Sequence, residues 1–191
     1  MRAILHGGFR SLNAADTRMA WQDFFAEMGR MTPDTVFILP WALPEKSHAG
    51  SLAAFQRRAD AFWSFDHRCG LVLSASDLMG ELAKLPQEAS VLIYLPGGIL
   101  TEKCVTEMRQ LSAENFPGRV IFAGYSAGAY ALTAFYYNPR KRKIVPGGGI
   151  FAGTVCCHAD TGRREQLSRE ITQKHRPVYV LPDCVLQIVK S

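Results

Sequence analysis

The sequence lacks any apolar run close to the roughly 20 residues that a membrane-spanning helix requires. The apolar stretch at residues 3–5 is also too short for the core of a secretory signal peptide. Internal repeats, low-complexity tracts and linker-like segments are missing as well. We therefore expect a cytoplasmic protein that forms one domain over residues 1–191 and has no membrane partner.

Cysteine is scarce and follows no recognisable spacing. The chain has five cysteines, an odd number, and none of them form a Cys-x-x-Cys pair. This favours free thiols in a reducing compartment over a disulfide framework. Cys156, Cys157 and His158 are adjacent in an expected strand, so their side chains alternate between two faces and do not converge on a metal. We expect no metal site and no cofactor.

Positive charge is modest overall but locally dense. The formal net charge is +5, and part of the excess lies in the run Arg140, Lys141, Arg142 and Lys143. Such a run could contact nucleic acid or an acidic substrate. Aromatic residues do not alternate with the basic ones, as a single-strand binding surface would require. We therefore expect a solvated loop between a helix and the next strand, and no nucleic-acid partner.

Short apolar segments alternate with helical patterns along the chain. Strands are expected at residues 3–5, 36–40, 70–75, 91–95, 120–123, 150–157 and 178–181. Helices are expected at residues 16–28, 51–63, 77–85, 101–111 and 130–132, with Asp77 as one helix cap. Apolar strands separated by helices predict a three-layer α/β fold, with a mostly parallel sheet covered by helices on both faces. Ligands bind such sheets at the carboxyl ends of their strands.

The segment Gly124-Tyr125-Ser126-Ala127-Gly128 follows one of these strands and opens a helix. Gly-x-Ser-x-Gly in this context is the pattern of a nucleophile elbow, in which a strained turn exposes the serine hydroxyl. Small neighbours are needed where the backbone crosses itself. The N–H of Ala127 would lie at the helix start, where it can stabilise an oxyanion. Ser126 is therefore the candidate nucleophile.

A serine nucleophile needs a base, usually a histidine that is oriented by a carboxylate. His158 stands at a strand end and is the favoured base, whereas His175 belongs to a polar helix terminus where an exposed histidine is expected. Asp160 and Asp183 are the candidate acids. We favour Asp183, because Ser126, His158 and Asp183 each follow an apolar strand and would meet at the same sheet edge.

Several segments come in an order that resembles the dipeptidase E (α-aspartyl dipeptidase) and cyanophycinase family of serine peptidases. They are Leu95-Pro96-Gly97-Gly98, the serine turn with Ala129, Val155-Cys156-Cys157-His158, Arg164-Glu165-Gln166 and Val180-Leu181-Pro182-Asp183. The resemblance implies a fold like that of class I glutamine amidotransferases, with serine replacing cysteine at the elbow. It also implies a small peptide as substrate, with aspartate at its N-terminus.

The resemblance assigns roles residue by residue. Ser126 is the nucleophile, His158 is the base, and Asp183 falls where the family has a glutamate. Gly97 and Gly98 fall on the turn that supplies the second oxyanion donor. Arg164 falls on a basic position that could pair with an acidic substrate group.

Departures from the family keep other interpretations open. The family's Gly-Gly-Gly-Asn-Thr turn reads Pro96-Gly97-Gly98-Ile99-Leu100 here, and Ala159 replaces an aromatic residue after the histidine. A non-catalytic relative that binds a ligand or partner is one alternative. An α/β-hydrolase esterase that uses Ser126, Asp160 and His175 is another, although only 65 residues follow Ser126. The sequence leaves open whether the protein forms a homodimer.

Overall fold

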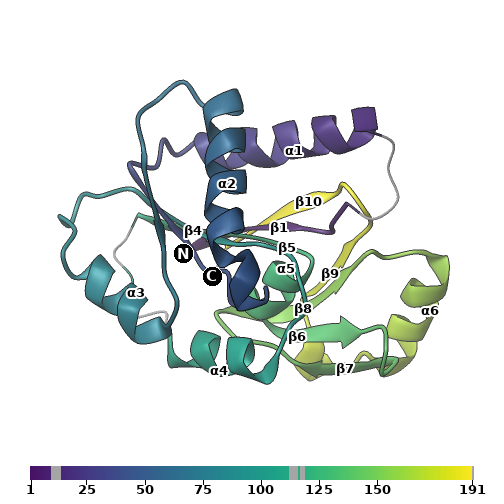
Figure 1. The fold of residues 1–191 in the computed structure, drawn as a ribbon. Helices are drawn as coiled ribbons and strands as arrows, with labels where there is room; N and C mark the ends of the chain where they lie inside the picture. The colour runs from purple at the N-terminus through teal and green to yellow at the C-terminus, as the bar shows by residue number, and fades with distance from the viewer. Residues whose placement is uncertain (10–13, 112–115, 117–118, 191) are drawn as a thin grey trace.

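Two β-sheets organise the chain in the computed structural model, which describes residues 1–9, 14–111, 116 and 119–190 (Figure 1). The larger sheet has six strands in the order β10-β1-β5-β4-β2-β3. Their bounds are β1 Arg2–His6, β2 Thr35–Ile38, β3 Arg68–Leu71, β4 Val91–Leu95, β5 Val120–Tyr125 and β10 Leu186–Lys190. All neighbours pair in parallel except the edge strand β10, which runs antiparallel to β1.

A second sheet of four strands lies beside the first, in the order β7-β6-β8-β9. Its strands are β6 Thr133–Asn138, β7 Lys143–Pro146, β8 Phe151–Cys157 and β9 Val178–Leu181. Strands β6, β8 and β9 are parallel, and β7 is antiparallel to β6. Strands β6, β7 and β10 were not expected from the sequence.

Of the basic run, Arg140, Lys141 and Arg142 lie in the turn between β6 and β7, and Lys143 begins β7. This corrects the expectation of a loop between a helix and a strand. The Oδ1 atom of Asn138 accepts hydrogen bonds from the backbone N–H groups of Arg140 and Lys141, each at 3.0 Å. A side chain that bonds the backbone two or three residues later closes a tight turn. Asn138 therefore sets the direction of the chain at this hairpin.

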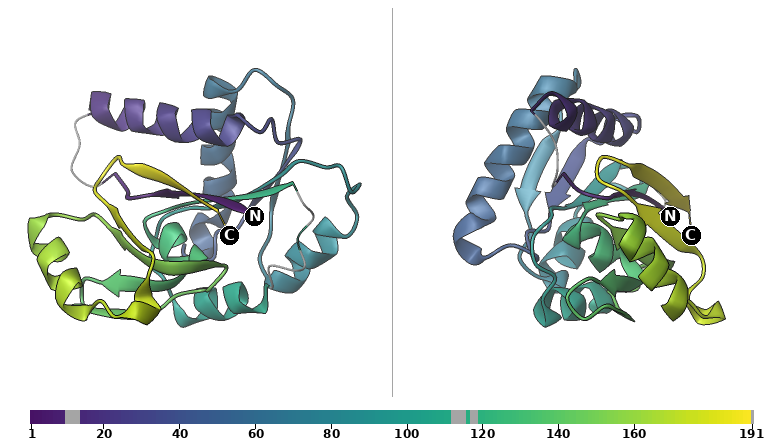
Figure 2. Two further views of the ribbon diagram at one scale, coloured as in Figure 1. Left: turned by 180° about the vertical axis from the view of Figure 1, so that it is seen from behind. Right: turned by 90° about the vertical axis from the view of Figure 1, so that its right-hand side faces the viewer.

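Helices cover both faces of the larger sheet (Figure 2). One face packs against α1 (Ala14–Gly29) and α2 (His48–Phe62), with Phe24, Phe25 and Phe55 fully buried between them and the sheet. The other face packs against α3 (Ala75–Leu82), α4 (Glu102–Gln110) and α5 (Ala127–Leu132). The side chains of β4 alternate between these two cores, which the period-two geometry of a strand requires.

The remaining helical segments lie at the rims. Helix α6 (Thr161–Glu170) and the short η3 (Gln173–His175) connect β8 to β9, and η1 (Glu45–Ser47) precedes α2. Together these elements confirm the expected three-layer α/β fold class.

Some element boundaries differ from the sequence expectation. Helix α3 begins earlier than predicted, because Ser74 is its cap: its Oγ accepts a hydrogen bond from the N–H of Asp77 at 3.1 Å. Strand β3 ends at Leu71, and Leu73 beyond it is half exposed. Strand β5 runs two residues further than predicted, so that Tyr125 is its last residue.

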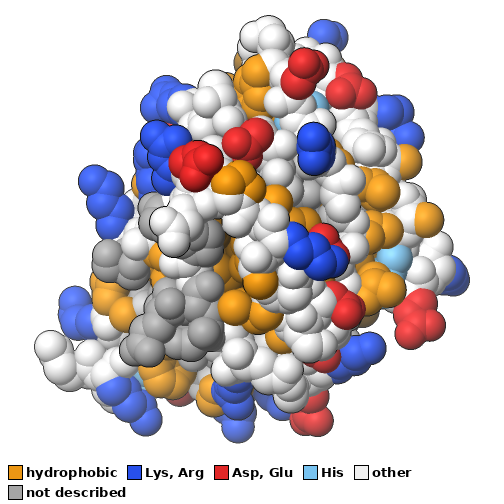
Figure 3. All heavy atoms as spheres, turned by 90° about the vertical axis from the view of Figure 1, so that its left-hand side faces the viewer, with side chains coloured by type: hydrophobic (Ala, Val, Ile, Leu, Met, Phe, Trp, Pro, Cys, Tyr) orange, Lys and Arg blue, Asp and Glu red, His pale blue; other side chains and the backbone are white. Residues whose placement is uncertain are grey.

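The molecular surface carries mixed charge. On the face shown in Figure 3, Lys and Arg side chains lie both at the edges and near the middle, with Asp and Glu among them. No helix within the described ranges is long and apolar enough to cross a membrane. All five cysteines are free thiols. Burial raises the pKa of Cys156 to about 11 and that of Cys104 to about 12, so these thiols stay protonated at neutral pH.

Candidate active site

Ser126 occupies a strained turn between β5 and α5. Its backbone has φ 51° and ψ −114°, a conformation that non-glycine residues rarely adopt. The surrounding chain fixes this turn, because the Ser126 N–H donates to the carbonyl oxygen of His6 at 3.0 Å. The Ser126 carbonyl in turn accepts from the N–H of Tyr130 at 3.1 Å. Strain held in this way is typical of functional sites.

Close backbone approaches explain the glycines that flank the serine. A Cβ atom at Gly128 would overlap the backbone carbonyl of Leu95, and one at Gly124 would overlap the backbone of Gly128. Either substitution would push β5, α5 and β4 apart. The glycines of the elbow are therefore required by packing.

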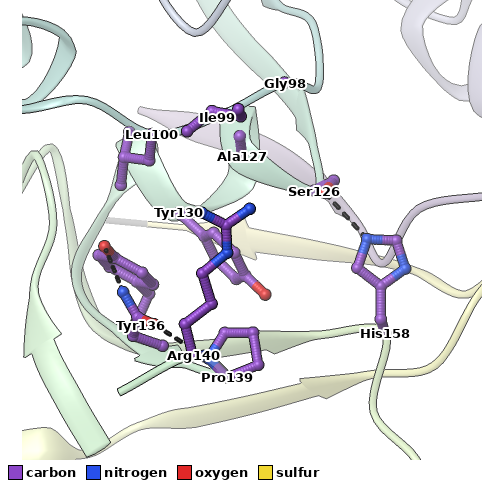
Figure 4. A pocket seen from close by; sticks show the side chains of 11 residues that line it. Gly98, Ile99, Leu100, Ser126, Ala127, Tyr130, Tyr136, Pro139, Arg140 and His158 are labelled. Carbon is purple, nitrogen blue, oxygen red and sulfur yellow. Dashed lines mark hydrogen bonds between the residues drawn. The ribbon is translucent and has the colours of Figure 1, made fainter. Parts of the chain in front are cut away.

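Three predicted site residues meet at the end of the parallel strands. Ser126 Oγ lies 2.9 Å from His158 Nε2, and His158 Nδ1 lies 2.5 Å from Asp183 Oδ1. The His158 side chain is 9% exposed and that of Asp183 is 16% exposed, so both retain only a narrow opening to solvent. Figure 4 shows the imidazole of His158 facing Ser126 across the pocket. The structure thus brings Ser126, His158 and Asp183 into one hydrogen-bonded chain.

The end of β1 holds in place the three segments that carry Ser126, His158 and Asp183. Its last residue and the two glycines after it present consecutive carbonyl oxygens, and each accepts one backbone hydrogen bond. The pairs are Ser126 N–H to His6 at 3.0 Å, His158 N–H to Gly7 at 3.1 Å and Cys184 N–H to Gly8 at 2.9 Å. This N-terminal turn was not predicted to be part of the site, since its contribution comes from backbone atoms.

Arg163 supports the base from α6. Its guanidinium donates to the carbonyl oxygens of His158 at 2.6 Å and Cys157 at 3.1 Å. His158 itself has φ 53°, so its backbone also needs external support. Arg163 was not among the predicted site residues, although helical spacing places it on the same face as Leu167, which is buried. Arg164, one residue later, is exposed on α6.

The alternative acid and base are engaged elsewhere. The Oδ1 of Asp160 accepts the N–H of Arg163 at 2.8 Å as the cap of α6, and its side chain is 68% exposed. His175 is buried, at 8% exposure, which corrects the expectation of an exposed histidine. Its Nδ1 accepts the N–H of Thr172 at 3.1 Å, and its ring packs against Phe135. The esterase alternative requires His175 to bond Ser126 and Asp160 to bond His175, and the described structure contains neither contact.

The glycine turn after β4 lies beside Ser126. Gly98 lines the cavities on both sides of the serine. The backbone of Gly97 is hydrogen-bonded to the Tyr125 hydroxyl. Burial raises the pKa of this hydroxyl, and the bond with Gly97 partly opposes that shift. Of the two glycines, Gly98 lines both of these cavities and Gly97 lines one of them. Ala127 begins α5, where the first N–H groups have no partner within the helix.

A second histidine is buried beneath this site. The Nδ1 atom of His6 accepts the N–H of Gly8 at 3.0 Å. Burial lowers its pKa to about 4; the Asp183 carboxylate opposes this shift and His158 adds to it. Among the described residues its Nε2 atom has no hydrogen-bond partner. His6 is therefore neutral at pH 7, which keeps a positive charge away from His158.

Two cavities open on Ser126. The first, of about 160 Å³, is lined by Ser126, His158 and Gly98 together with Tyr130, Tyr136 and Arg140, and we call it the junction cavity (Figure 4). The second, of about 360 Å³, lies on the other side of the serine, and we call it the aromatic cavity. Its lining residues are Gly8, Phe9, Trp21, Gly97, Gly98, Tyr125, Ser126 and His158.

The chemistry available here is that of nucleophilic acyl transfer. A hydroxyl, an imidazole and a carboxylate in sequence can activate a nucleophile and move its proton. Within the part of the chain that the structure describes, no group of three or more His, Cys, Asp or Glu side chains could hold a metal ion.

Comparison with known proteins adds the fold relationship. No family model matches the chain, and no curated protein matches it. Among solved structures it is similar to a peptidase from an acI-B1 Actinobacterium, with 18% sequence identity and a TM-score of 0.61. The alignment covers 99% of this chain and 83% of that chain. At this identity the likeness shows a shared fold, in agreement with the α/β class expected from the sequence.

Proposed function

We propose that this protein is a serine-type peptidase that cleaves small peptides. Ser126 is the nucleophile, His158 is the general base and Asp183 orients the imidazole. The observation that carries the proposal is the chain of hydrogen bonds from Ser126 Oγ through His158 to Asp183. The choice of a peptidase over other acyl hydrolases draws on the family resemblance and on the fold shared with a solved peptidase.

In the first step, Ser126 Oγ attacks the carbonyl carbon of the scissile peptide bond. His158 Nε2 takes the hydroxyl proton as the new C–O bond forms. Asp183 holds the proton on Nδ1, which fixes the tautomer and stabilises the imidazolium. The oxygen of the former carbonyl becomes negative, and the N–H groups of Ala127 and Gly98 are the donors that we assign to it.

In the second step, the C–N bond breaks and His158 returns its proton to the departing amine. The carboxyl half of the bond remains as an ester on Ser126. Water then attacks this ester, with His158 again as base, and the ester breaks to release the acid and restore the serine hydroxyl. His158 passes the proton taken from Ser126 to the departing amine, and the proton taken from water back to Ser126.

An activated serine reacts with a fluorophosphonate probe, whereas an ordinary serine does not. We expect the wild-type protein to be labelled at Ser126, and both Ser126→Ala and His158→Ala to lose the label. Asp160→Asn is the matched control, since asparagine also caps helices, and it should label normally. Peptide mapping of the labelled site and a thermal melt of each variant complete the measurement. Unlabelled wild-type protein would contradict the proposal.

The non-catalytic alternative draws on the turn after β4. Ile99 follows Gly98 there and is 63% exposed, at the place where the family has polar residues. A turn of this kind fits a protein that keeps the elbow but binds a partner or ligand. Absence of labelling in a folded wild-type protein would favour this alternative.

A further inference from the structure

The junction cavity shares part of its wall with a third cavity. This third cavity has a volume of about 630 Å³, and we call it the basic cavity. The residues that line both it and the junction cavity are Leu100, Tyr136, Asn138 and Arg140. Arg140 therefore lines both the cavity that contains Ser126 and the basic cavity.

The charges around the basic cavity are unbalanced. Its lining residues include four cations, Arg109, Arg140, Lys141 and Lys143, and one acid, Glu102. Within the described ranges none of these four cations takes part in an ion pair. Clustered like charges raise the local concentration of a counter-ion and favour an anionic ligand.

The backbone of Arg140 is fixed at the border between the two cavities, and its side chain is exposed. The Asn138 side chain fixes the backbone N–H of Arg140 at 3.0 Å and also donates to the hydroxyl of Tyr136 at 3.4 Å. Figure 4 shows the Arg140 side chain extending into the junction cavity, which also contains Ser126 and His158. A guanidinium in this position can bind a carboxylate through two parallel hydrogen bonds.

We propose that the basic cavity binds a carboxylate-bearing part of the substrate and that Arg140 reads the carboxylate nearest to Ser126. The substrate class is then a short acidic peptide that extends from the scissile bond toward the β6–β7 turn. This inference rests on the proposed function and adds a specificity-determining residue to it. It gives the acid-reading role to Arg140, whereas the family resemblance gives it to Arg164.

The carboxylate can come from an acidic side chain or from the C-terminus of the peptide. A set of tripeptides separates these sources: Ala-Ala-Asp and Ala-Ala-Asn, each as free acid and as C-terminal amide, and Asp-Ala-Ala. If the side chain is read, aspartate outperforms asparagine in the amides as well. If the C-terminal carboxylate is recognised, the free acids bind better than the amides, and aspartate has no advantage over asparagine.

The experiment measures binding by calorimetry in the Ser126→Ala background, so that it does not depend on turnover. We expect the preferred acidic peptide to bind about tenfold more tightly than its neutral counterpart, the size of one charge-assisted hydrogen bond at a solvated site. Adding Arg140→Gln should remove this preference. Adding Arg142→Gln is the matched control, because Arg142 belongs to the same turn but lines neither cavity, and it should keep the preference.

Three results would overturn the inference: an unchanged preference with Arg140→Gln, its loss with Arg164→Gln instead, or no saturable binding of any acidic peptide up to about 10 mM. Fluorophosphonate labelling distinguishes this failure from that of the proposed function. Normal labelling with no effect of Arg140→Gln leaves the peptidase and removes the basic subsite. Absent labelling together with a preference that depends on Arg140 removes the peptidase and leaves the basic subsite.

Discussion

The two sides of Ser126 differ in chemistry and in origin. On one side, the aromatic cavity is built from the N-terminal half and β5, where Phe9 and Trp21 stack with ring centroids 4.1 Å apart. On the other side, the basic cavity is built mainly from α4 and the β6–β7 hairpin, with four cations at its wall. A nucleophile between two such environments can orient its substrate, since the apolar and acidic ends of a peptide prefer opposite sides.

The difference also shows which parts of the site are shared. Under the proposed function, the hydrogen bonds from Ser126 to His158 and Asp183 serve every substrate, whereas each of the two cavities contacts one end of it. Changes in the shared centre should therefore lower all activity together. Changes in one cavity should alter the preference among substrates.

The largest effect is expected from Asp183→Asn. Loss of the carboxylate leaves His158 in the wrong tautomer, which lowers kcat by up to about 10⁴-fold. Acidic and neutral peptides should lose the same factor, because the residue belongs to the shared centre. Steady-state kinetics with both peptide types checks this. Asp160→Asn is the control and should retain most activity; equal damage by the two variants would refute the assignment of the acid.

Gly8→Ala tests the border between the aromatic cavity and the base. Gly8 has φ +115°, and a Cβ atom there would collide with the imidazole of His158. A displaced base lowers kcat/KM by about 100-fold. Binding of Ala-Ala-Asp in the Ser126→Ala background should change little, since the basic cavity lies on the other side. Gly80→Ala in α3, where a Cβ atom meets nothing within 4 Å, is the matched control.

Acidification should destabilise the side of the molecule beneath the aromatic cavity. His6 stacks on Phe9, with ring centroids 4.3 Å apart, and burial lowers its pKa from 6.5 to about 4. The unfolded chain therefore binds more protons than the folded one between these values, so stability falls as the pH falls. The expected loss from pH 6.5 to pH 5 is about 1.5 kcal/mol.

Denaturant unfolding at the two pH values measures this loss. The His6→Gln variant cannot titrate at this position, so the dependence of its stability on pH should be smaller by the same amount. If the two proteins had the same pH dependence, His6 would not be the responsible group.

The smallest effect concerns ionic strength. Salt screens the cations of the basic cavity, so raising it from about 0.05 M to about 0.5 M should reduce the preference for acidic over neutral peptides by a few-fold. Hydrolysis of neutral peptides should change much less, because the aromatic cavity does not rely on charge. A preference that is independent of salt would argue against recognition by exposed cations.

Local sequence patterns were sufficient for the strand-turn-helix segment that carries Ser126 and for the fold class. The Gly-x-Ser-x-Gly segment follows a buried strand and opens a helix, and this context depends on residues that are neighbours in the chain. Strand ends also selected His158 and Asp183, because parallel strands bring their carboxyl ends to one edge. The alternation of apolar strands and helices determined the α/β class in the same way.

Only the tertiary structure decided which distant groups complete the site. The carbonyl oxygens of His6, Gly7 and Gly8 meet the later segments through pairing between strands far apart in the chain. The second sheet, the antiparallel edge strand β10 and the burial of His175 also depend on long-range packing. The choice between Arg140 and Arg164 is of this kind, since charge and local pattern treat them alike. Their place relative to Ser126 is set by how the β6–β7 hairpin and α6 pack onto the rest of the chain.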